Sequence, residues 1–213
     1  MSKILDFIFV RDSHVCPWWL CFTFDNIFRK LIQNPCKILE PYIKEGDTIL
    51  DAGPGMGYFT IPLARLAGEK GHVIAADIQE KMLRALKKRA EQAGVDKRII
   101  LHLCSLDSLG IKEKVNFILA FWMVHEVSDK QRFLKELFSV LEDNGTFLLA
   151  EPSIHVTRSN FEETVNLAVQ AGFTLRDSPR IFTSRSALLV KLAKNEQSEV
   201  GSDSYTYPAQ RSV

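Results

Sequence analysis

The stretch Thr48–Ile61, TILDAGPGMGYFTI, decides the fold of this 213-residue chain. A run with strand character leads to Asp51, and glycines then alternate with other residues at positions 53, 55 and 57. A helix is predicted to start at about Tyr58. Glycine allows positive φ angles and lets a ligand approach the backbone, and a helix N-terminus favours anionic groups. The stretch therefore predicts a strand, glycine loop and helix that bind a carboxylate or a phosphate.

The spacing of the glycines separates two classes of ligand. The dinucleotide fingerprint GxGxxG would require a glycine at position 58, where this chain has Tyr58. The observed GxGxG pattern follows Asp51, whose carboxylate would repel a pyrophosphate and attract an ammonium group. The pattern favours a ligand with an amino-acid part over NAD.

A second carboxylate follows the next predicted strand. The run HVIAAD at residues 72–77 ends at Asp77, twenty residues after Gly57. A carboxylate at this point can accept two hydrogen bonds from a ribose diol. An Asp that closes a strand can also simply cap the following helix, predicted here over residues 79–93. The order strand, acid, GxGxG, helix, strand and acid favours the ligand-binding interpretation.

Short apolar runs alternate with amphipathic stretches along the middle of the chain. Apolar residues at a 3.6-residue period predict helices over residues 79–93 and 129–141. Five strands are predicted in TILDAG, HVIAAD, IILHL, VNFILAF and TFLLAE. Two further strands, in FTLRDSPRIF and SALLVKLA, are joined by a turn at Pro179. The alternation predicts a three-layer α/β domain, with a parallel sheet between helices on both faces and a hairpin at its end.

Four positions are predicted to delimit helices. Ser128 and Ser159 are each followed three residues later by Gln or Glu, which is the spacing of a capping box at a helix start. Gly145 and Gly172 stand where a left-handed residue would end a helix.

Composition excludes several classes of protein. Lys and Arg number 27 against 26 Asp and Glu, a net charge of +1 that provides no bulk electrostatic footprint for nucleic acid. The four cysteines, Cys16, Cys21, Cys36 and Cys104, form no CxxC pair, so reduced thiols and no metal site are expected. Neither a signal peptide nor a membrane span is predicted, which favours a cytoplasmic protein. An oligomer is not indicated.

Four segments together resemble motifs of the class I S-adenosylmethionine-dependent methyltransferases: ILDAGPGMGYFTIPLARL, VIAADIQEKML, NFILAFWMVHEV and GTFLLAEP. The resemblance covers about residues 35–193. Within the class, the chain is most similar to the small-molecule branch that includes the quinone-biosynthesis and arsenite methyltransferases. It implies a Rossmann-like seven-stranded sheet of order 3-2-1-4-5-7-6 with strand 7 antiparallel. It also implies S-adenosyl-L-methionine as cofactor and S-adenosyl-L-homocysteine as product.

The resemblance further implies cofactor-binding residues at the ends of four strands: Asp51, Gly53, Gly55, Gly57, Asp77, Ile78, Ser105, Leu106 and Phe121. The glycine loop and Asp51 would face the methionine part of the cofactor. Asp77 would hold the ribose, and Ile78 would pack on the adenine. Ser105 stands near the position where the family commonly has an Asp that meets the adenine amino group.

Methyl transfer from a sulfonium is an in-line displacement, in which positioning and desolvation supply most of the acceleration. A general base matters only if the acceptor must lose a proton. His125 and Glu151 are the predicted catalytic residues, and Trp122, Glu126 and His155 are further candidates. The alternative for the first two is a structural role, with the imidazole packed at a helix start.

Composition and pattern divide the chain into three zones, and the resemblance places a lid over the acceptor in the first of them. Residues 1–45 are predicted to form an aromatic-rich helical lid over the acceptor, residues 46–193 the cofactor-binding domain, and residues 194–213 a flexible tail. Trp18, Trp19, Phe22 and Phe24 would form an apolar wall of the lid, although packing on the core is the alternative. The cysteines show no thiolate motif for a soft metalloid.

These observations predict a methyltransferase that acts on a small, apolar or aromatic acceptor. The alternatives are a non-catalytic module that binds the cofactor and a protein- or RNA-directed methyltransferase. The stretch AFWMVHEV, which stands where an NPPY-type motif would be, opposes methylation of bases and amide nitrogens. Tyr58 disfavours a nucleotide-dependent oxidoreductase.

Overall fold

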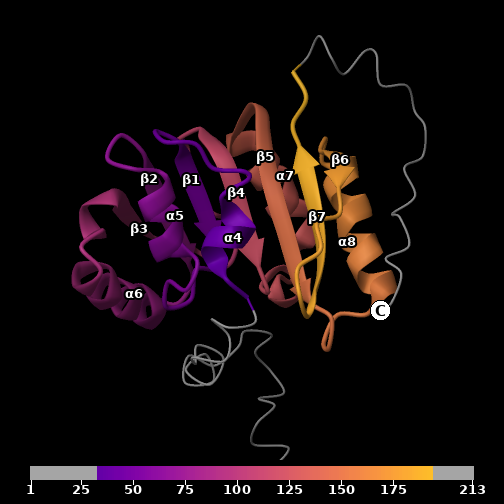
Figure 1. The fold of residues 1–213 in the computed structure, drawn as a ribbon. Helices are drawn as coiled ribbons and strands as arrows, with labels where there is room; N and C mark the ends of the chain where they lie inside the picture. The colour runs from indigo at the N-terminus through magenta and orange to yellow at the C-terminus, as the bar shows by residue number, and fades with distance from the viewer. Residues whose placement is uncertain (1–32, 194–213) are drawn as a thin grey trace, which may run out of the picture.

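Seven strands form one sheet, in the order β3-β2-β1-β4-β5-β7-β6, in the computed structural model, which describes residues 33–193 (Figure 1). The strands are β1 (Thr48–Ala52), β2 (His72–Asp77), β3 (Ile99–Leu103), β4 (Val115–Phe121), β5 (Leu141–Pro152), β6 (Thr174–Asp177) and β7 (Ser184–Val190). Strands β1 to β5 pair in parallel, whereas β7 is antiparallel to β5 and β6. The predicted strand order and the antiparallel seventh strand are confirmed.

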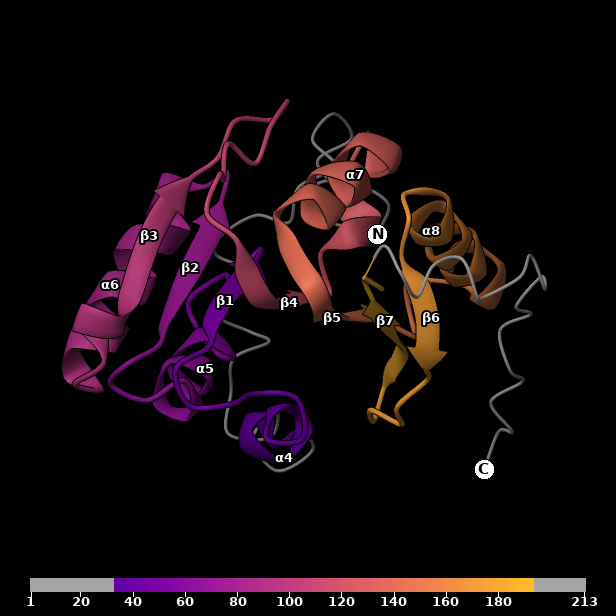
Figure 2. The same ribbon diagram turned by 90° about the horizontal axis from the view of Figure 1, so that it is seen from above.

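Helices cover both faces of the sheet. They are α4 (Pro35–Leu39), α5 (Thr60–Leu66), α6 (Glu80–Gln92), α7 (Lys130–Val140) and α8 (Arg158–Gln170), with short 3-10 helices at Asp96–Arg98 and Val124–Glu126. Figure 2 shows α4 and α5 on one face of the sheet and α7 and α8 on the other. Helix α6 packs against β2 and β3. The predicted three-layer architecture is confirmed.

Neighbouring residues of the central strands bury their side chains on opposite faces. Ile49 belongs to the apolar cluster that includes Leu63 of α5, and Leu50 belongs to the cluster that includes Leu134 of α7. All four side chains are fully buried. Each such side chain stabilises the fold by about 1.5–3 kcal/mol. Burial on both faces explains why these strands are continuous apolar runs in the sequence.

The ends of the helices differ in detail from the predictions. Asp129, not Ser128, caps α7, because its Oδ1 accepts a hydrogen bond from the N–H of residue 132 at 2.9 Å. Thr157, not Ser159, caps α8 through its Oγ1. In both cases a nearby residue of a type that also favours N-cap positions caps the helix, and the carboxylate at position 129 also complements the helix dipole.

The helix expected at about Tyr58 begins at Thr60, because residues 55–59 form turns. Gly172 has a φ of +114° after the end of α8, as predicted. The prediction for Gly145 is wrong, because α7 ends at Val140 and the chain continues directly into β5, where Asn144 has the positive φ, of +63°. Asn is one of the few residues with a side chain that tolerate this conformation.

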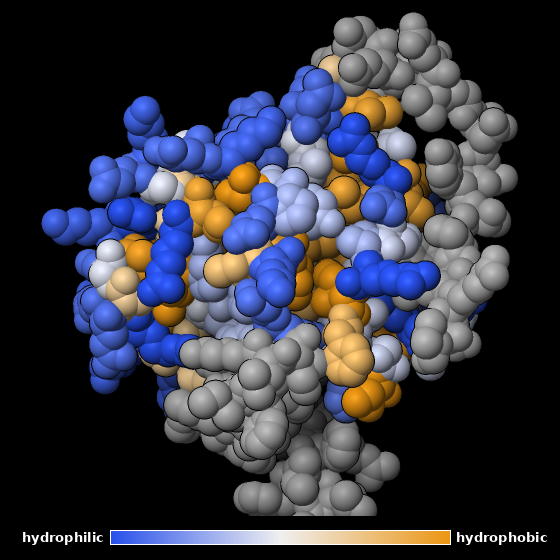
Figure 3. Space-filling view, in the orientation of Figure 1, coloured by the Kyte–Doolittle hydropathy of each residue, from blue (hydrophilic) through white to orange (hydrophobic). Residues whose placement is uncertain are grey.

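The parallel strands place their carboxyl ends at one edge of the sheet, the lower edge in Figure 1. Strand β1 lies between β2 and β4, and the chain order reverses there. Open α/β sheets bind ligands at this switch point. Figure 3 shows apolar side chains at the surface near the lower ends of β5 and β7, where Ile154 and Phe182 are largely exposed.

Among the helices of residues 33–193, none has the length and apolar character needed to cross a membrane.

Candidate functional site

Asp51 provides a buried carboxylate at the carboxyl end of β1. Its residue is only 2% exposed, and the hydroxyl of Thr60 donates a hydrogen bond to Oδ2 at 2.6 Å. Burial raises the pKa of Asp51 to about 7, which the bond from Thr60 partly opposes and the charge of Asp77 reinforces. A carboxylate with so little solvation gains strongly from a cationic partner.

Asp77 provides a second carboxylate at the end of β2. Burial raises its pKa to about 6, although hydrogen bonds from the backbone N–H groups of Gln79, Gly55 and Ile78 act in the opposite direction. The bond from Gln79 measures 2.8 Å, and Gln79 itself is the N-cap of α6. The bond from Gly55 ties the glycine loop to Asp77. The two predicted acids and the loop between them therefore lie together.

The glycine loop is closed on one side and open on the other. Gly53, Gly55 and Gly57 all have positive φ angles. A Cβ added at Gly57 would lie 2.1 Å from Cδ1 of Leu86 on α6, whereas one added at Gly55 would meet no atom within 4 Å. Gly57 thus allows close packing of the loop on α6, and Gly55 borders the space where a ligand would approach the backbone.

We expect Gly57→Ala to destabilise the protein by about 1–3 kcal/mol more than Gly94→Ala, because of overpacking against Leu86. Gly94 is a matched control, since it has a φ of +67° but no atom within 4 Å of an added Cβ. Urea unfolding of the two variants measures the difference. Equal losses would show that Leu86 moves aside freely and that the packing argument is wrong.

The residues predicted on the adenine side lie at the ends of β2 and β3. Ile78 is partly exposed, Ser105 is exposed and Leu106 is 73% exposed. The N–H of Cys104 donates to the backbone oxygen of Asp77 at 2.9 Å, which holds the chain after β3 beside the end of β2. Phe121 differs from them, because it is buried and its ring centroid lies 4.1 Å from that of Phe59.

His125 and Glu151, which follow β4 and end β5, meet in one hydrogen-bonded pair. Nδ1 of His125 lies 2.6 Å from Oε2 of Glu151, and the backbone N–H of His125 donates to Oε1 at 2.9 Å. The Glu151 side chain is 2% exposed and the imidazole 28%. Because a carboxylate only accepts hydrogen bonds, Nδ1 carries the proton. In the neutral imidazole, Nε2 is then the nitrogen that can accept a proton. Glu126 Oε1 lies 3.9 Å from Nε2.

This pair changes the acidity of the imidazole. Burial alone would lower the pKa of His125, but the hydrogen bond that His125 donates to Glu151 and the charges of Glu151 and Glu126 outweigh burial and the charge of Lys130. The pKa of His125 is therefore raised above its ordinary value of 6.5. The imidazole is a stronger base than a free histidine and is held in one orientation.

Two residues with strained backbones lie at the same edge: Trp122, a further candidate from the sequence, and Thr183, which no sequence pattern indicated. Trp122 has a φ of +61° and Thr183 a φ of +60°, unusual angles for side chains of this kind. The indole Nε1 of Trp122 donates to Oγ of Ser184 at 2.8 Å. Backbone strain of this kind clusters at ligand-binding sites. The place of Trp122 after the fourth strand made it a candidate in the sequence, but only the structure shows the positive φ angles of Trp122 and Thr183.

Gln33 joins this edge to the glycine loop. Its side-chain Nε2 donates to the backbone oxygen of Phe182 at 2.8 Å and to Oγ1 of Thr183 at 3.1 Å. Its backbone oxygen accepts the hydroxyl of Tyr58 at 2.6 Å. Buried Gln33 therefore connects the start of α5 with the turn before β7.

The other candidates lie apart or outside. His155 is exposed, and its backbone closes a turn on Pro152. The aromatic residues of the predicted lid, Cys16 and Cys21 lie outside the described residues. Cys36 and Cys104 are reduced, and within residues 33–193 no group of His, Cys, Asp and Glu could hold a metal ion.

The sheet order, the antiparallel seventh strand and the glycine loop between two carboxylates define a Rossmann-like fold of the class I methyltransferase type. Residues 43–202 match the family model described as a methyltransferase domain. The match spans more than half of the chain, which therefore belongs to this family of methyltransferase domains.

Relatives and solved structures agree with this assignment. The ubiquinone/menaquinone biosynthesis C-methyltransferase UbiE of Vibrio cholerae is 32% identical over 109 residues, which cover 51% of this chain and 42% of that protein. The corresponding enzyme of Photorhabdus laumondii is 29% identical over 110 residues, or 51% of this chain and 44% of that protein. The match thus spans less than half the length of these curated relatives.

Among solved structures, a SAM-dependent methyltransferase from Aquifex aeolicus superposes with a TM-score of 0.73 at 22% identity, covering 83% of this chain and 98% of that one. The [4+2]-cyclase SpnF superposes with a TM-score of 0.63 at 15% identity, covering 75% of this chain and 81% of that one. The same fold therefore occurs in a protein named for a different reaction, and the reaction must be argued from the site.

Proposed function

We propose that this protein transfers the methyl group of S-adenosylmethionine to a small, apolar or aromatic acceptor, with His125 as general base. The observation that carries the proposal is the pair of His125 and Glu151, at the edge that also holds the glycine loop. The names of the UbiE relatives, ubiquinone/menaquinone biosynthesis C-methyltransferases, support a small-molecule acceptor.

The residues present fit the cofactor by charge and by space. Asp51, buried and short of solvation, would hold the ammonium group, and Asp77 would accept hydrogen bonds from the ribose hydroxyls. The open side of the loop at Gly55 leaves room for the carboxylate of the methionine part. The exposed apolar side chains of Ile78 and Leu106 would pack on the adenine. When bound, the cofactor supplies a methyl group already activated by the sulfonium.

The role of His125 follows from its orientation. Glu151 accepts the Nδ1 proton, so Nε2 is the nitrogen that can accept a proton from the acceptor. Attack by the acceptor would form a bond to the methyl carbon and leave the electron pair of the broken carbon–sulfur bond on sulfur. Nε2 takes the proton that the acceptor loses, and Glu151 stabilises the imidazolium that results. A C- or O-methylation of a hydroxylated ring would use such a base.

The acceptor would lie against Trp122, whose indole is fixed by Ser184. We also propose that residues 1–45 act as a lid on this side. In support, the chain reaches the carboxyl edge at Gln33, whose side chain binds the turn at residues 182–183. The aromatic residues that precede Gln33 in the sequence would supply an apolar wall for a flat acceptor.

Calorimetric titration with S-adenosylhomocysteine, with NADH as the control ligand, tests the proposal. We expect micromolar binding of S-adenosylhomocysteine and no binding of NADH. If the protein bound neither ligand, the glycine loop would have only a structural role, and the proposed function would be wrong. A protein that binds S-adenosylhomocysteine, but forms none from S-adenosylmethionine when a pool of metabolites is offered as acceptors, would be a non-catalytic module.

In the same titration, Asp77→Ala is expected to weaken the binding of S-adenosylhomocysteine by about 1–3 kcal/mol, the scale of lost charge-assisted hydrogen bonds. Asp96→Ala, which removes an exposed Asp at the start of a 3-10 helix, is the control and should leave the affinity unchanged. Unchanged affinity in Asp77→Ala would remove this residue from the proposed site.

A further inference from the structure

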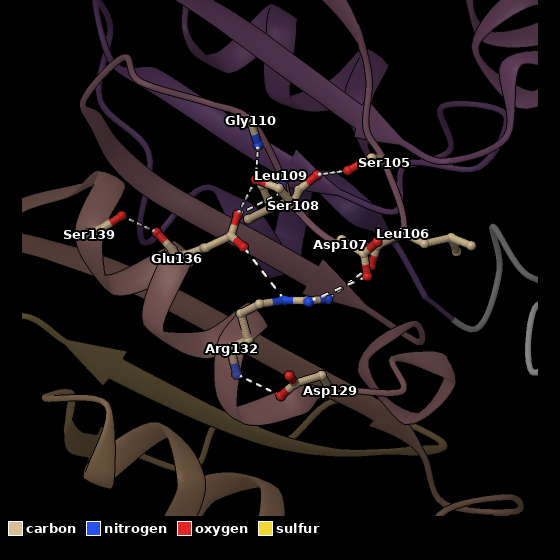
Figure 4. Close-up of polar contacts among 10 residues, drawn as sticks. All are labelled: Ser105, Leu106, Asp107, Ser108, Leu109, Gly110, Asp129, Arg132, Glu136 and Ser139. Atoms are coloured by element: carbon tan, nitrogen blue, oxygen red, sulfur yellow. Dashed lines mark hydrogen bonds and ion pairs between the residues drawn. The ribbon is translucent and has the colours of Figure 1, made fainter.

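The loop between β3 and β4 folds into a small closed unit, drawn in Figure 4. The N–H and the hydroxyl of Ser105 both donate to the backbone oxygen of Ser108, at 3.2 and 3.3 Å. The N–H of Gly110 donates to Oγ of Ser108 at 3.0 Å. The loop thus has a defined shape, although most of its residues are exposed.

Two side chains of α7 hold this loop from outside. Oε2 of Glu136 accepts the N–H of Leu109 at 2.6 Å and the hydroxyl of Ser108 at 3.1 Å. Arg132 donates to the backbone oxygen of Leu106 at 3.0 Å and to Oδ1 of Asp107 at 3.5 Å. Figure 4 shows both side chains reaching from the helix toward the loop. Arg132 thus binds the loop at residues 106–107, and Glu136 binds it at residues 108–109.

Arg132 and Glu136 also support each other. Nε of Arg132 lies 3.9 Å from Oε1 of Glu136, one helical turn away. The backbone N–H of Arg132 donates to Asp129, which caps α7 (Figure 4). The clamp formed by Arg132 and Glu136 is therefore attached to a fixed helix start.

The other end of the loop begins at the proposed cofactor site. Cys104 is bonded through its N–H to the backbone oxygen of Asp77, and Ser105 and Leu106 follow directly. Burial and the charges of Asp77 and Glu136 raise the pKa of the Cys104 thiol to about 11, which is consistent with both carboxylates lying near it. The Leu106 side chain points away from α7 in Figure 4 and is 73% exposed. An apolar side chain is thus held outward by a fixed backbone.

We propose that Arg132 and Glu136 are positioning residues that hold Ser105 and Leu106 in place for the adenine of the cofactor. This inference rests on the proposed function. Neither residue needs to touch the ligand, since each acts through the loop backbone. A loop that is ordered before binding does not have to be ordered by the ligand, so the clamp increases affinity for adenosine-containing ligands.

The test measures dissociation constants of S-adenosylhomocysteine and of 5′-methylthioadenosine, which shares the adenosine part but lacks the amino acid. In Arg132→Ala and in Glu136→Ala, we expect both ligands to weaken by the same factor, about 3- to 10-fold, the effect of one or two net hydrogen bonds. Arg132→Lys should recover part of the affinity, because it restores one donor. The unliganded melting temperature should change little, which separates positioning from general destabilisation.

Arg158→Ala is the matched control, because it removes an arginine that forms an i,i+4 pair with Glu162 on α8. It should bind both ligands as the wild type does. Wild-type affinity in both clamp variants, or equal losses in the clamp variants and Arg158→Ala, would overturn the clamp alone. A wild-type protein that binds neither ligand would overturn the proposed function, and the clamp's role with it.

Discussion

Asp51→Asn is expected to stabilise the ligand-free protein above pH 7 and to remove most of its affinity for S-adenosylhomocysteine. The folded-state pKa of Asp51, about 7, lies above the ordinary 3.8. Protonated Asp51 therefore favours the folded state at low pH, and this advantage is lost as the pH rises from about 4 to about 7. The neutral amide does not titrate, so the variant should be more stable at pH 8 by about 2–4 kcal/mol.

Affinity should change in the opposite direction. An ammonium group bound at Asp51 needs the ionised carboxylate, and the amide leaves that charge without a partner. We expect a loss of about 3–5 kcal/mol, the range found when one partner of a buried ion pair is removed. For the wild type, binding near pH 6.5 should release a proton, which titrations in buffers of different ionisation enthalpy detect. The variant should release less.

Asp143→Asn is the control for both effects, because its side chain is 56% exposed and lies in an ion pair with Lys191. It removes the same charge without changing a buried site, so melting curves at pH 5 and pH 8 should follow those of the wild type. If Asp51→Asn bound S-adenosylhomocysteine normally, the ammonium group would lie elsewhere. If its stability at pH 8 did not rise, the carboxylate would be solvated better than its burial indicates.

The sequence was sufficient to predict the sheet, because the central strands are buried on both faces. Pairs such as Ile49 and Leu50 produce continuous apolar runs, which are hard to confuse with amphipathic helices. The order of the strands came from the resemblance of the motifs and not from the apolar pattern. Details of helix ends were less predictable. Asp129 competes with Ser128 for one cap, and only the three-dimensional geometry decides between such neighbours.

The candidate site was predictable as a set of residues but not as a set of contacts. Asp51, Asp77 and the glycines were predicted because they follow the first two strands in a regular order, and the structure places them together. His125 and Glu151 were selected separately, 26 residues apart, and the sequence did not show that they form one pair. The Arg132 clamp carries no signature, since arginine and glutamate at i,i+4 are typical of any exposed helix face.

The alternatives for the enzyme differ in how they use this edge. A module that only bound the cofactor would need the acids and the glycine loop, but it would gain nothing from a buried Glu151 that orients an imidazole. The burial of a carboxylate is unfavourable unless its hydrogen bonds are satisfied, and here His125 supplies two of them. The histidine pair is therefore the feature to test for catalysis.

Glu151→Gln is expected to lower turnover about 10- to 100-fold, which is part of the total contribution of a general base to the rate. It is also expected to move the acid limb of the pH–rate profile to lower pH. Burial lowers the pKa of His125, but the hydrogen bond that it donates to Glu151 and the charge of Glu151 raise it above the ordinary value. In the wild type, turnover should therefore rise with pH through a value above 6.5, as His125 loses its proton. The amide lacks the charge, so the variant's imidazole titrates at lower pH and is a weaker base.

Turnover is measured as release of S-adenosylhomocysteine with an acceptor found in the metabolite screen. Glu142→Gln, the same substitution at an exposed position of β5, is the control and should show the wild-type profile. S-adenosylhomocysteine affinity should be unchanged in both variants, because neither Glu151 nor Glu142 is among the proposed cofactor contacts. His125→Ala should lose more activity than Glu151→Gln, because it removes the base itself. A slower Glu151→Gln with an unmoved acid limb would assign the titrating group elsewhere and leave the pair a structural role.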